Sequence, residues 1–286
     1  MCELMALSFA EPVSADFSLR AFASRGEFNP DGWGLAWYPD GGPAVALVKE
    51  PVPWGSSPTA GFLAGHPTLV SRIYLAHVRE KTVGGDPRHA DTHPFTRELG
   101  GRDYALAHNG TLQGPAWDLP LGTFRPVGAT DSERFFCHLM GLLGDRAATG
   151  SPLAGPDDWA WLHRTLADVN CHGKLNVLFS DGDRLFVYHD ANGWKGLNFR
   201  RVRVRDGRPR HFGDDDLAID LEPAGGSAAP ANPGYVVATR PLSPAGWQPF
   251  QLGELLVFDR GRVAYSSHRP VDAPEFAPRD PIAAGA

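Results

Sequence analysis

Several features that mark other protein classes are missing from this sequence. No apolar run approaches the ~18 residues that a membrane-spanning helix needs, and the N-terminus lacks the basic and apolar regions of a signal peptide. The formal net charge is −6, and no basic domain of the kind found in nucleic-acid-binding proteins is present. The one basic stripe, residues 200–205, is more typical of an exposed strand face. We therefore expect neither a membrane nor a nucleic acid as a partner.

Cysteine is also scarce, with three residues at positions 2, 137 and 171. An odd, low number without an export signal favours reduced thiols and a cytoplasmic protein. The 286 residues, 42% of them hydrophobic, are enough to bury a large core. No internal repeat and no linker midway along the chain are evident. We predict one domain over residues 2–269, followed by a flexible Pro/Ala-rich tail over residues 270–286.

The hydrophobic pattern predicts strands, then helices, then strands again. Strands are expected over residues 3–9, 33–38, 44–49, 71–79, 104–108, 174–180, 184–189, 197–204, 234–239, 254–259 and 262–266. Helices are expected over residues 14–25, 59–64, 134–143 and 156–169, and long loops over residues 80–101 and 222–233. Without alternation of strand and helix, this order indicates an α+β protein with largely antiparallel sheets. Two sheets with helices outside them would accommodate the pattern.

Cys2 combines two reactive groups once the preceding methionine is removed. Cysteine is small enough for that removal, and the processed chain would carry a thiol and a free α-amino group on one residue. The thiolate is the attacking species, and an α-amino group, with a pKa of about 7.7–8.0, can act as a base near neutral pH. The alternative is an ordinary cysteine in a buried strand, a common place for a free thiol.

Asn109 and Gly110 follow an apolar strand and admit two interpretations that are compatible with each other. Asn-Gly is a strong signal for a tight hairpin turn. The asparagine amide and the glycine N–H can also point at one developing negative oxygen, as in an oxyanion hole. Such donors contribute about a hundred- to a thousandfold in rate each.

Arg79 and Asp131 each have a simple structural interpretation and a functional one. Arg79 ends a strand, where a solvated surface charge is common, but its planar guanidinium also suits a carboxylate. Asp131, or its neighbour Thr130, can cap the helix that follows, but its charge also suits an ammonium group. An arginine for a carboxylate and an aspartate for an ammonium together describe an amino-acid-binding site.

Four histidines raise the alternative of a metal site: His77, His89, His93 and His108. His89 and His93 are four residues apart, a spacing that brings two side chains together only on a helix. Pro94 and the polar loop around it argue against a helix there. No set of His, Asp or Glu has convincing zinc-binding spacing, so we expect neither a metal nor an organic cofactor.

An ordered set of motifs between residues 2 and 265 carries a resemblance to a known family. The motifs are Met1-Cys2-Glu3-Leu4, Asp31-Gly32-Trp33-Gly34, Ala76-His77-Val78-Arg79, Thr92-His93-Pro94-Phe95, Ala107-His108-Asn109-Gly110, Thr130-Asp131-Ser132-Glu133, Asn176-Val177-Leu178-Phe179-Ser180-Asp181-Gly182 and Ala238-Thr239-Arg240-Pro241-Leu242. With them the sequence resembles the class-II glutamine amidotransferases, which are N-terminal-nucleophile hydrolases, and most closely their stand-alone, YafJ-like branch. The fold implied is a four-layer αββα sandwich, with two largely antiparallel sheets between helix layers.

The resemblance implies hydrolysis of glutamine to glutamate and ammonia through a γ-glutamyl thioester. Its catalytic residues would be Cys2, Asn109 and Gly110, and the last two would stabilise the oxyanion. Substrate would be bound by Arg79 at its α-carboxylate and by Asp131 at its α-ammonium. Three further residues would line the pocket: Thr82, His93 and Trp33.

The sequence departs from the family in two respects. Glu80 follows Arg79, where synthase-linked members usually have an aromatic residue. No synthase domain is apparent either, so ammonia would be released to water unless another protein subunit accepts it. Two alternatives stay open, namely hydrolysis of another γ-glutamyl amide, in a peptide or a thiol metabolite, and an inactive amidotransferase-like subunit.

Overall fold

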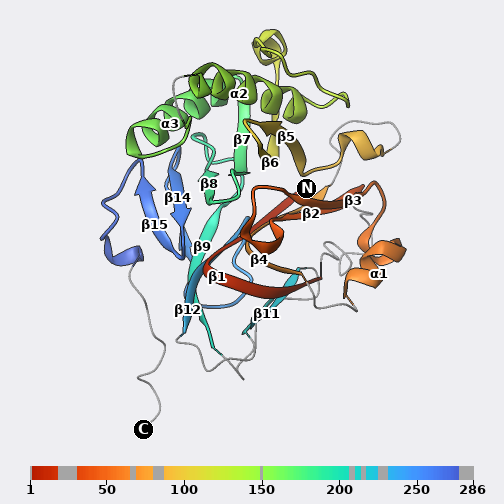
Figure 1. Ribbon diagram of the computed structural model, residues 1–286, viewed down its shortest axis with the longest axis vertical. Helices are drawn as coiled ribbons and strands as arrows, with labels where there is room; N and C mark the ends of the chain where they lie inside the picture. Colours follow the sequence, from red (N-terminus) through yellow and green to blue (C-terminus); the bar gives the residue numbers. More distant parts are fainter. Residues whose placement is uncertain are drawn as a thin grey trace.

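The computed structural model describes residues 2–18, 31–64, 69–79, 87–148, 151–205, 210–213, 217–224 and 231–276. Two stacked antiparallel sheets make up its centre (Figure 1). No helix in these parts of the chain is long and apolar enough to cross a membrane.

The larger sheet, sheet A, is built from the first strands of the chain and from strands between residues 198 and 249. Its strands are β1 (Glu3–Ser18), β2 (Gly32–Trp37), β3 (Ala46–Glu50), β4 (Val70–Arg79), β9 (Asn198–Val204), β10 (Arg210–Gly213), β11 (Ala218–Pro223), β12 (Asn232–Ala238) and β13 (Gln248–Pro249). The order is β13-β9-β12-β1-β4-β2-β3, and β11 pairs with the second half of β1 and with β10. The N-terminal strand therefore lies in the middle of this sheet.

The smaller sheet, sheet B, is built from the middle and the end of the chain. Its strands are β5 (Phe95–Leu99), β6 (Arg102–Leu112), β7 (Gly173–Ser180), β8 (Arg184–Tyr188), β14 (Leu255–Asp259) and β15 (Arg262–Ser266). The order is β15-β14-β8-β7-β6-β5. Strands β6 and β7 are neighbours in this sheet, and both pack against β4 of sheet A.

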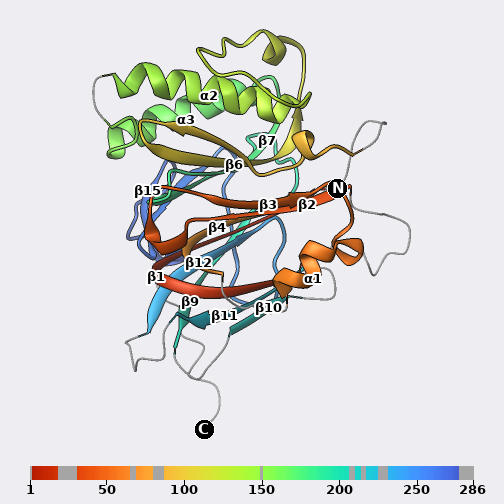
Figure 2. The ribbon, with the colours of Figure 1, turned by 45° about the vertical axis from the view of Figure 1, so that its right-hand side comes forward.

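Helices cover the outer faces of the two sheets. Figure 2 shows α2 (Asp131–Ala147) and α3 (Pro156–Asn170) above sheet B, with sheet A below it. The short helix α1 (Pro58–Ala64) lies against the outer face of sheet A, where Ala60 joins the apolar cluster of that face. The predicted arrangement of two antiparallel sheets between helix layers is confirmed.

Strict alternation along the strands separates three apolar layers. On β1, Leu4 and Ala6 belong to the core between the sheets, whereas Met5 and Leu7 belong to the outer face of sheet A. A third cluster lies between sheet B and the pair α2 and α3. Any side chain near Cys2 can therefore be assigned to a layer from its register.

The first part of the chain differs from the pattern-based expectation. We predicted a helix over residues 14–25, but β1 continues to Ser18, and residues 19–25 lie outside the described residues. The pairing of β1 with β4 shifts between Ser8 and Val13. This irregularity accommodates Pro12, because proline is tolerated at bulges, and beyond it Val13, Ala15 and Phe17 are buried at a strand's period of two.

Two other expectations also need correction. The long loop predicted over residues 80–101 contains strand β5, which pairs with the first half of β6. The predicted flexible tail does not begin at residue 270, because Phe276 is buried and its carbonyl accepts hydrogen bonds from Tyr235 and Arg201. Residues 277–286 lie outside the described residues.

Candidate active site

The candidate site lies where the start of β1, the end of β4 and the end of β6 meet. Leu4 pairs with His77, and His77 pairs with Gly34, so their side-chain positions share the face of sheet A that looks toward sheet B. Cys2 and Arg79 are each two residues from this row, and alternation places them on the same face. Asn109 reaches this space from sheet B, as its contact with Cys2 shows.

The Cys2 thiol is only partly exposed and is not in a disulfide. The side-chain amide Nδ2 of Asn109 donates a hydrogen bond to the carbonyl oxygen of Cys2 over 2.9 Å. Burial raises the pKa of the Cys2 thiol to about 11, although the positive charges of Lys195 and Arg79 act in the opposite direction. The thiol is therefore mostly protonated at neutral pH, and a nucleophile at this position needs a base.

Asn109 and Gly110 lie within β6 and do not form a turn. They pair with Asn176 and Leu175 of β7, so the hairpin interpretation of this dipeptide is wrong. A β-carbon added to Gly110 would lie 1.9 Å from the carbonyl oxygen of Lys174, which leaves glycine as the residue that this close approach admits. The pairing of β6 with β5 ends at Leu106, so the opposite edge of β6 has no β5 partner at Asn109 and Gly110.

Arg79 ends β4 and pairs with Gly32 of β2. Its carbonyl accepts a hydrogen bond from the N–H of Asp31 over 2.8 Å, which fixes its backbone. Nitrogen Nη1 of its guanidinium is buried and has no hydrogen-bond partner among the described residues. A buried donor without a partner is costly unless a ligand supplies the acceptor, so the simple interpretation as a solvated surface charge does not hold.

Asp131 is the first residue of α2, but it does not cap the helix. The cap is Thr130, whose hydroxyl accepts from the N–H of Glu133 over 3.1 Å. Oxygen Oδ2 of Asp131 instead accepts from the N–H of Leu112 over 2.6 Å. The carboxylate therefore joins the end of β6 to the start of α2, two residues beyond Gly110.

His93 lies next to His77 under the site, with ring centroids 4.4 Å apart. Both rings are buried, and neither has a hydrogen-bond partner among the described residues. Burial lowers the pKa of His77 to about 3 and moves the pKa of His93 well below its usual value. Both are therefore neutral, and no group of three described His, Cys, Asp or Glu side chains is arranged to hold a metal ion.

Lys49 holds the segment around His93 in place. Its Nζ donates to the carbonyls of Thr92, over 2.7 Å, and Pro94, over 3.3 Å, on either side of the cis peptide bond between His93 and Pro94. Burial lowers the pKa of Lys49 to about 8. Sequence reasoning missed this lysine because nothing in the local pattern of β3 indicates which carbonyls lie above it.

Trp33 does not line the site. It is fully buried on the outer face of sheet A, where its ring meets that of Trp54 with centroids 4.6 Å apart. The prediction that Trp33 contacts substrate is therefore wrong, and this side chain supports the sheet from behind. Thr82, the remaining predicted site residue, lies outside the described residues.

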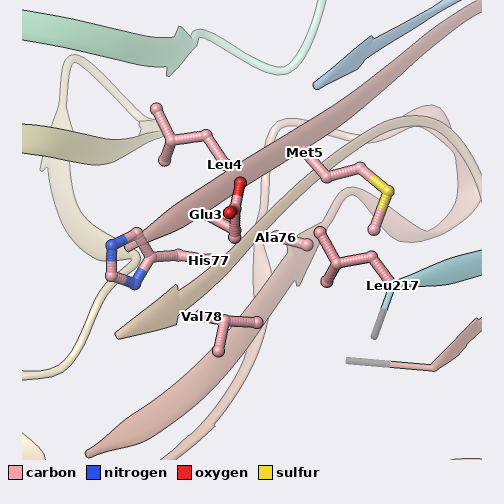
Figure 3. Close-up of a pocket in the computed structure, with 7 residues that line it drawn as sticks. All are labelled: Glu3, Leu4, Met5, Ala76, His77, Val78 and Leu217. Atoms are coloured by element: carbon pink, nitrogen blue, oxygen red, sulfur yellow. The ribbon is translucent and has the colours of Figure 1, made fainter. Parts of the chain in front are cut away.

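A small gap lies between β1 and β4. Figure 3 shows Leu4 and His77 on one side of this strand pair and Met5 and Leu217 on the other. The gap has no room for even a water molecule, so it is packing space between the two strands and no candidate for a substrate site.

Comparisons with known proteins agree with this geometry. The family model for class-II glutamine amidotransferases matches residues 1–281. YafJ of Escherichia coli K12 is 33% identical over 273 residues, which cover 90% of this chain and all of YafJ. The γ-glutamyl-hercynylcysteine sulfoxide hydrolase of Mycolicibacterium smegmatis is 28% identical over 207 residues, which cover 64% of this chain and 81% of that protein.

Among solved structures, a predicted glutamine amidotransferase from Pseudomonas aeruginosa PA01 has the same fold. It superposes with a TM-score of 0.72 at 32% identity, covering 92% of this chain and 99% of that one. The family match spans nearly the whole chain, and the sequence similarity and the fold point the same way. The chain belongs to the class-II glutamine amidotransferase family.

Proposed function

We infer that this protein hydrolyses the side-chain amide of glutamine, with Cys2 as the nucleophile. The observation that carries the proposal is the meeting of three groups from distant parts of the chain. These are the Cys2 thiol, the Asn109 amide bonded to the Cys2 carbonyl, and the buried Arg79 nitrogen without a partner among the described residues.

The proposed reaction begins with attack of the Cys2 sulfur on the amide carbon of the substrate side chain. The α-amino group of processed Cys2 takes the thiol proton, and Asn109 and Gly110 stabilise the oxyanion of the tetrahedral intermediate. The carbon–nitrogen bond breaks, and ammonia leaves with the transferred proton. Water then attacks the γ-glutamyl thioester, which releases glutamate and the free thiol.

Substrate recognition in this proposal uses opposite charges at the two ends of the amino-acid group. Arg79 binds the α-carboxylate, which supplies the missing acceptor for its buried Nη1. Asp131 binds the α-ammonium with the carboxylate capacity that the Leu112 N–H leaves available. His93 supports the pocket as a neutral ring, and Thr82 stays a proposed pocket residue. Neither a metal nor an organic cofactor takes part in this scheme.

The proposal places the protein in the cytoplasm, where a free thiol stays reduced. Ammonia passes to water or to an accepting protein subunit. A second candidate reaction is hydrolysis of another γ-glutamyl amide, and the similarity to the γ-glutamyl-hercynylcysteine sulfoxide hydrolase supports it. Both reactions use the same glutamyl head group and the same nucleophile, and they differ only in the leaving group.

Labelling with 6-diazo-5-oxo-L-norleucine, a glutamine-like electrophile, tests the nucleophile and the head-group site together. Intact-mass measurement should show loss of Met1 and one covalent adduct. The adduct should disappear in Cys2→Ala and persist in Cys171→Ala, which removes an exposed thiol outside the site. Retained Met1, or a processed chain that takes up no label, would support the inactive-subunit alternative.

A further inference from the structure

Residues 189–197 form a tightly held loop beside the candidate site. The carboxylate of Asp190 is buried and accepts hydrogen bonds from the N–H groups of Trp194, Asn192 and Leu175 and from the Asn170 amide. The His189 ring, also buried, contacts the carbonyl oxygen of Lys195 over 3.0 Å. With this many internal bonds, the loop presents its side chains in a fixed arrangement.

The loop is fastened to sheet B next to Asn109. The side-chain amide of Asn176 donates to the carbonyl oxygen of Trp194 over 2.7 Å. Asn176 is also the register partner of Asn109, the proposed oxyanion donor. Trp194 is therefore connected to Asn109 through Asn176.

Two of the four lysines of the chain meet the ring of Trp194. The Nζ of Lys174 lies 3.6 Å from the ring centroid and the Nζ of Lys195 lies 5.8 Å from it. Lys174 precedes Asn176 and Leu178 at the strand period of two, and Leu178 belongs to the core between the sheets, so Lys174 stands on the face of β7 that looks toward sheet A. The ring and the two ammonium groups thus border the space that contains Cys2.

Two observations link the cluster of Trp194, Lys174 and Lys195 to the candidate site. The positive charge of Lys195 lowers the pKa of the Cys2 thiol against the effect of burial, so Lys195 is within electrostatic reach of the sulfur. The indole Nε1 of Trp194 is buried and has no hydrogen-bond partner among the described residues. An indole N–H is a donor only, and a ligand oxygen would satisfy it.

The charges exceed what free glutamine requires. Glutamine has one carboxylate, which the proposed function assigns to Arg79 from sheet A, and its leaving group is neutral ammonia. Lys174 and Trp194 come from the other side of Cys2, with sheet B. A substrate that uses these groups has a second negative charge, located on the part of the molecule that leaves.

We propose that Trp194, Lys174 and Lys195 form a second subsite that binds a carboxylate on the leaving group of a γ-glutamyl amide. The preferred substrates are then γ-glutamyl amino acids or short γ-glutamyl peptides. The inference rests on the proposed function, since it keeps Cys2, the glutamyl head group and the thioester. The γ-glutamyl carbon–nitrogen bond breaks, the amine of the leaving amino acid takes the proton, and water later releases glutamate.

The experiment compares three substrates of the purified, processed protein. These are glutamine, γ-glutamylglycine and γ-glutamylglycinamide, and the last two differ only in the charge at the leaving end. We expect kcat/KM for γ-glutamylglycine to exceed that for the glycinamide by about fivefold for each lysine that the carboxylate meets, the upper value for an exposed ion pair. Added salt should reduce this preference, because exposed charges are screened.

Variants then assign the preference to the cluster. Lys195→Met and Lys174→Met should each lower the ratio of the two kcat/KM values, and Lys195→Arg should keep it. A general effect on the thiol or on folding acts on both substrates and cancels in the ratio. Arg262→Met, which removes an exposed cation from the far edge strand of sheet B, is the matched control and should leave the ratio unchanged.

The outcomes separate this inference from the proposed function. Hydrolysis of glutamine with equal rates for the acid and its amide overturns the second subsite and leaves the proposed function standing. A preference for the acid that survives both lysine substitutions also overturns it. If the protein hydrolyses none of the three compounds, the proposed function fails, and the subsite fails with it.

Discussion

The ionisation of the Cys2 thiol can be measured directly, and it tests how the proposed nucleophile works. Burial raises the pKa of this thiol to about 11, against about 8.5 for a free cysteine. At about pH 8, roughly one free cysteine thiol in four is ionised, whereas a thiol with this raised pKa is ionised in about one molecule in a thousand. The folded site therefore holds very little preformed thiolate.

The experiment is a pH titration of the protein and of its Cys2→Ala variant, in which the ultraviolet absorbance of the thiolate is measured at each pH. Subtracting the variant removes the contributions of Cys137, Cys171 and the tyrosines, which both proteins share. The difference should stay small up to about pH 9 and rise only toward pH 11. It should reach about one tenth of its full value near pH 10, one unit below the pKa.

Activity should follow a different group. If the α-amino group of Cys2 takes the thiol proton during attack, kcat/KM for glutamine rises as that amine loses its own proton. The rise should have an apparent pKa of roughly 8 and then a plateau. A thiolate signal that is already complete below about pH 9 would refute this reasoning, because the site would then hold a preformed thiolate and would need no base.

Three further predictions concern single substitutions. Arg79→Lys should lower kcat/KM for glutamine by about 10- to 100-fold, mainly through KM, since lysine lacks the planar fork of arginine. Steady-state ammonia release measures this loss. An unchanged KM would mean that the α-carboxylate binds elsewhere. Gly110→Ala should destabilise the fold by about 1–3 kcal/mol, because its β-carbon would meet the Lys174 carbonyl at 1.9 Å; an unshifted urea midpoint would contradict the pairing of β6 with β7. Arg269→Met should cost about 3–5 kcal/mol, since it leaves the fully buried Glu254 carboxylate without its cation. Urea unfolding measures that loss, and restoration by the added change Glu254→Gln is the control.

The hydrophobic pattern of the sequence predicted most strands and helices. For the strands it succeeded because burial along them follows the strand period of two. It failed where pairing across the sheet overrides local preference. Asn109 and Gly110 have strong turn chemistry, yet β6 continues through them because β7 supplies an unbroken partner from Gly173 to Ser180. The second half of β1 was predicted as a helix because its apolar residues, Phe17 among them, also match a helical spacing.

The residues of the candidate site also fall into a predictable and an unpredictable group. Cys2, Arg79, Asn109 and Asp131 could be named from the sequence, because each belongs to a short motif that carries the resemblance to the family. Their supporting residues could not be named, since the contacts are remote in sequence. Nothing in the loop that contains Lys195 indicates that its charge acts on a thiol near residue 2.

The position of β1 in the middle of sheet A has a consequence for when the site exists. The N–H of Leu4 contacts the hydroxyl of Thr239 across 235 residues of sequence, and β12 provides one side of β1. At about 5–20 residues per second, a ribosome needs roughly 10–50 s to make the intervening chain. Until then the first half of β1 has its partner on one side only, which is β4. A chain that is interrupted before β12 therefore leaves one edge of β1, next to Cys2, without its partner strand, and the candidate site is completed only when synthesis has passed β12.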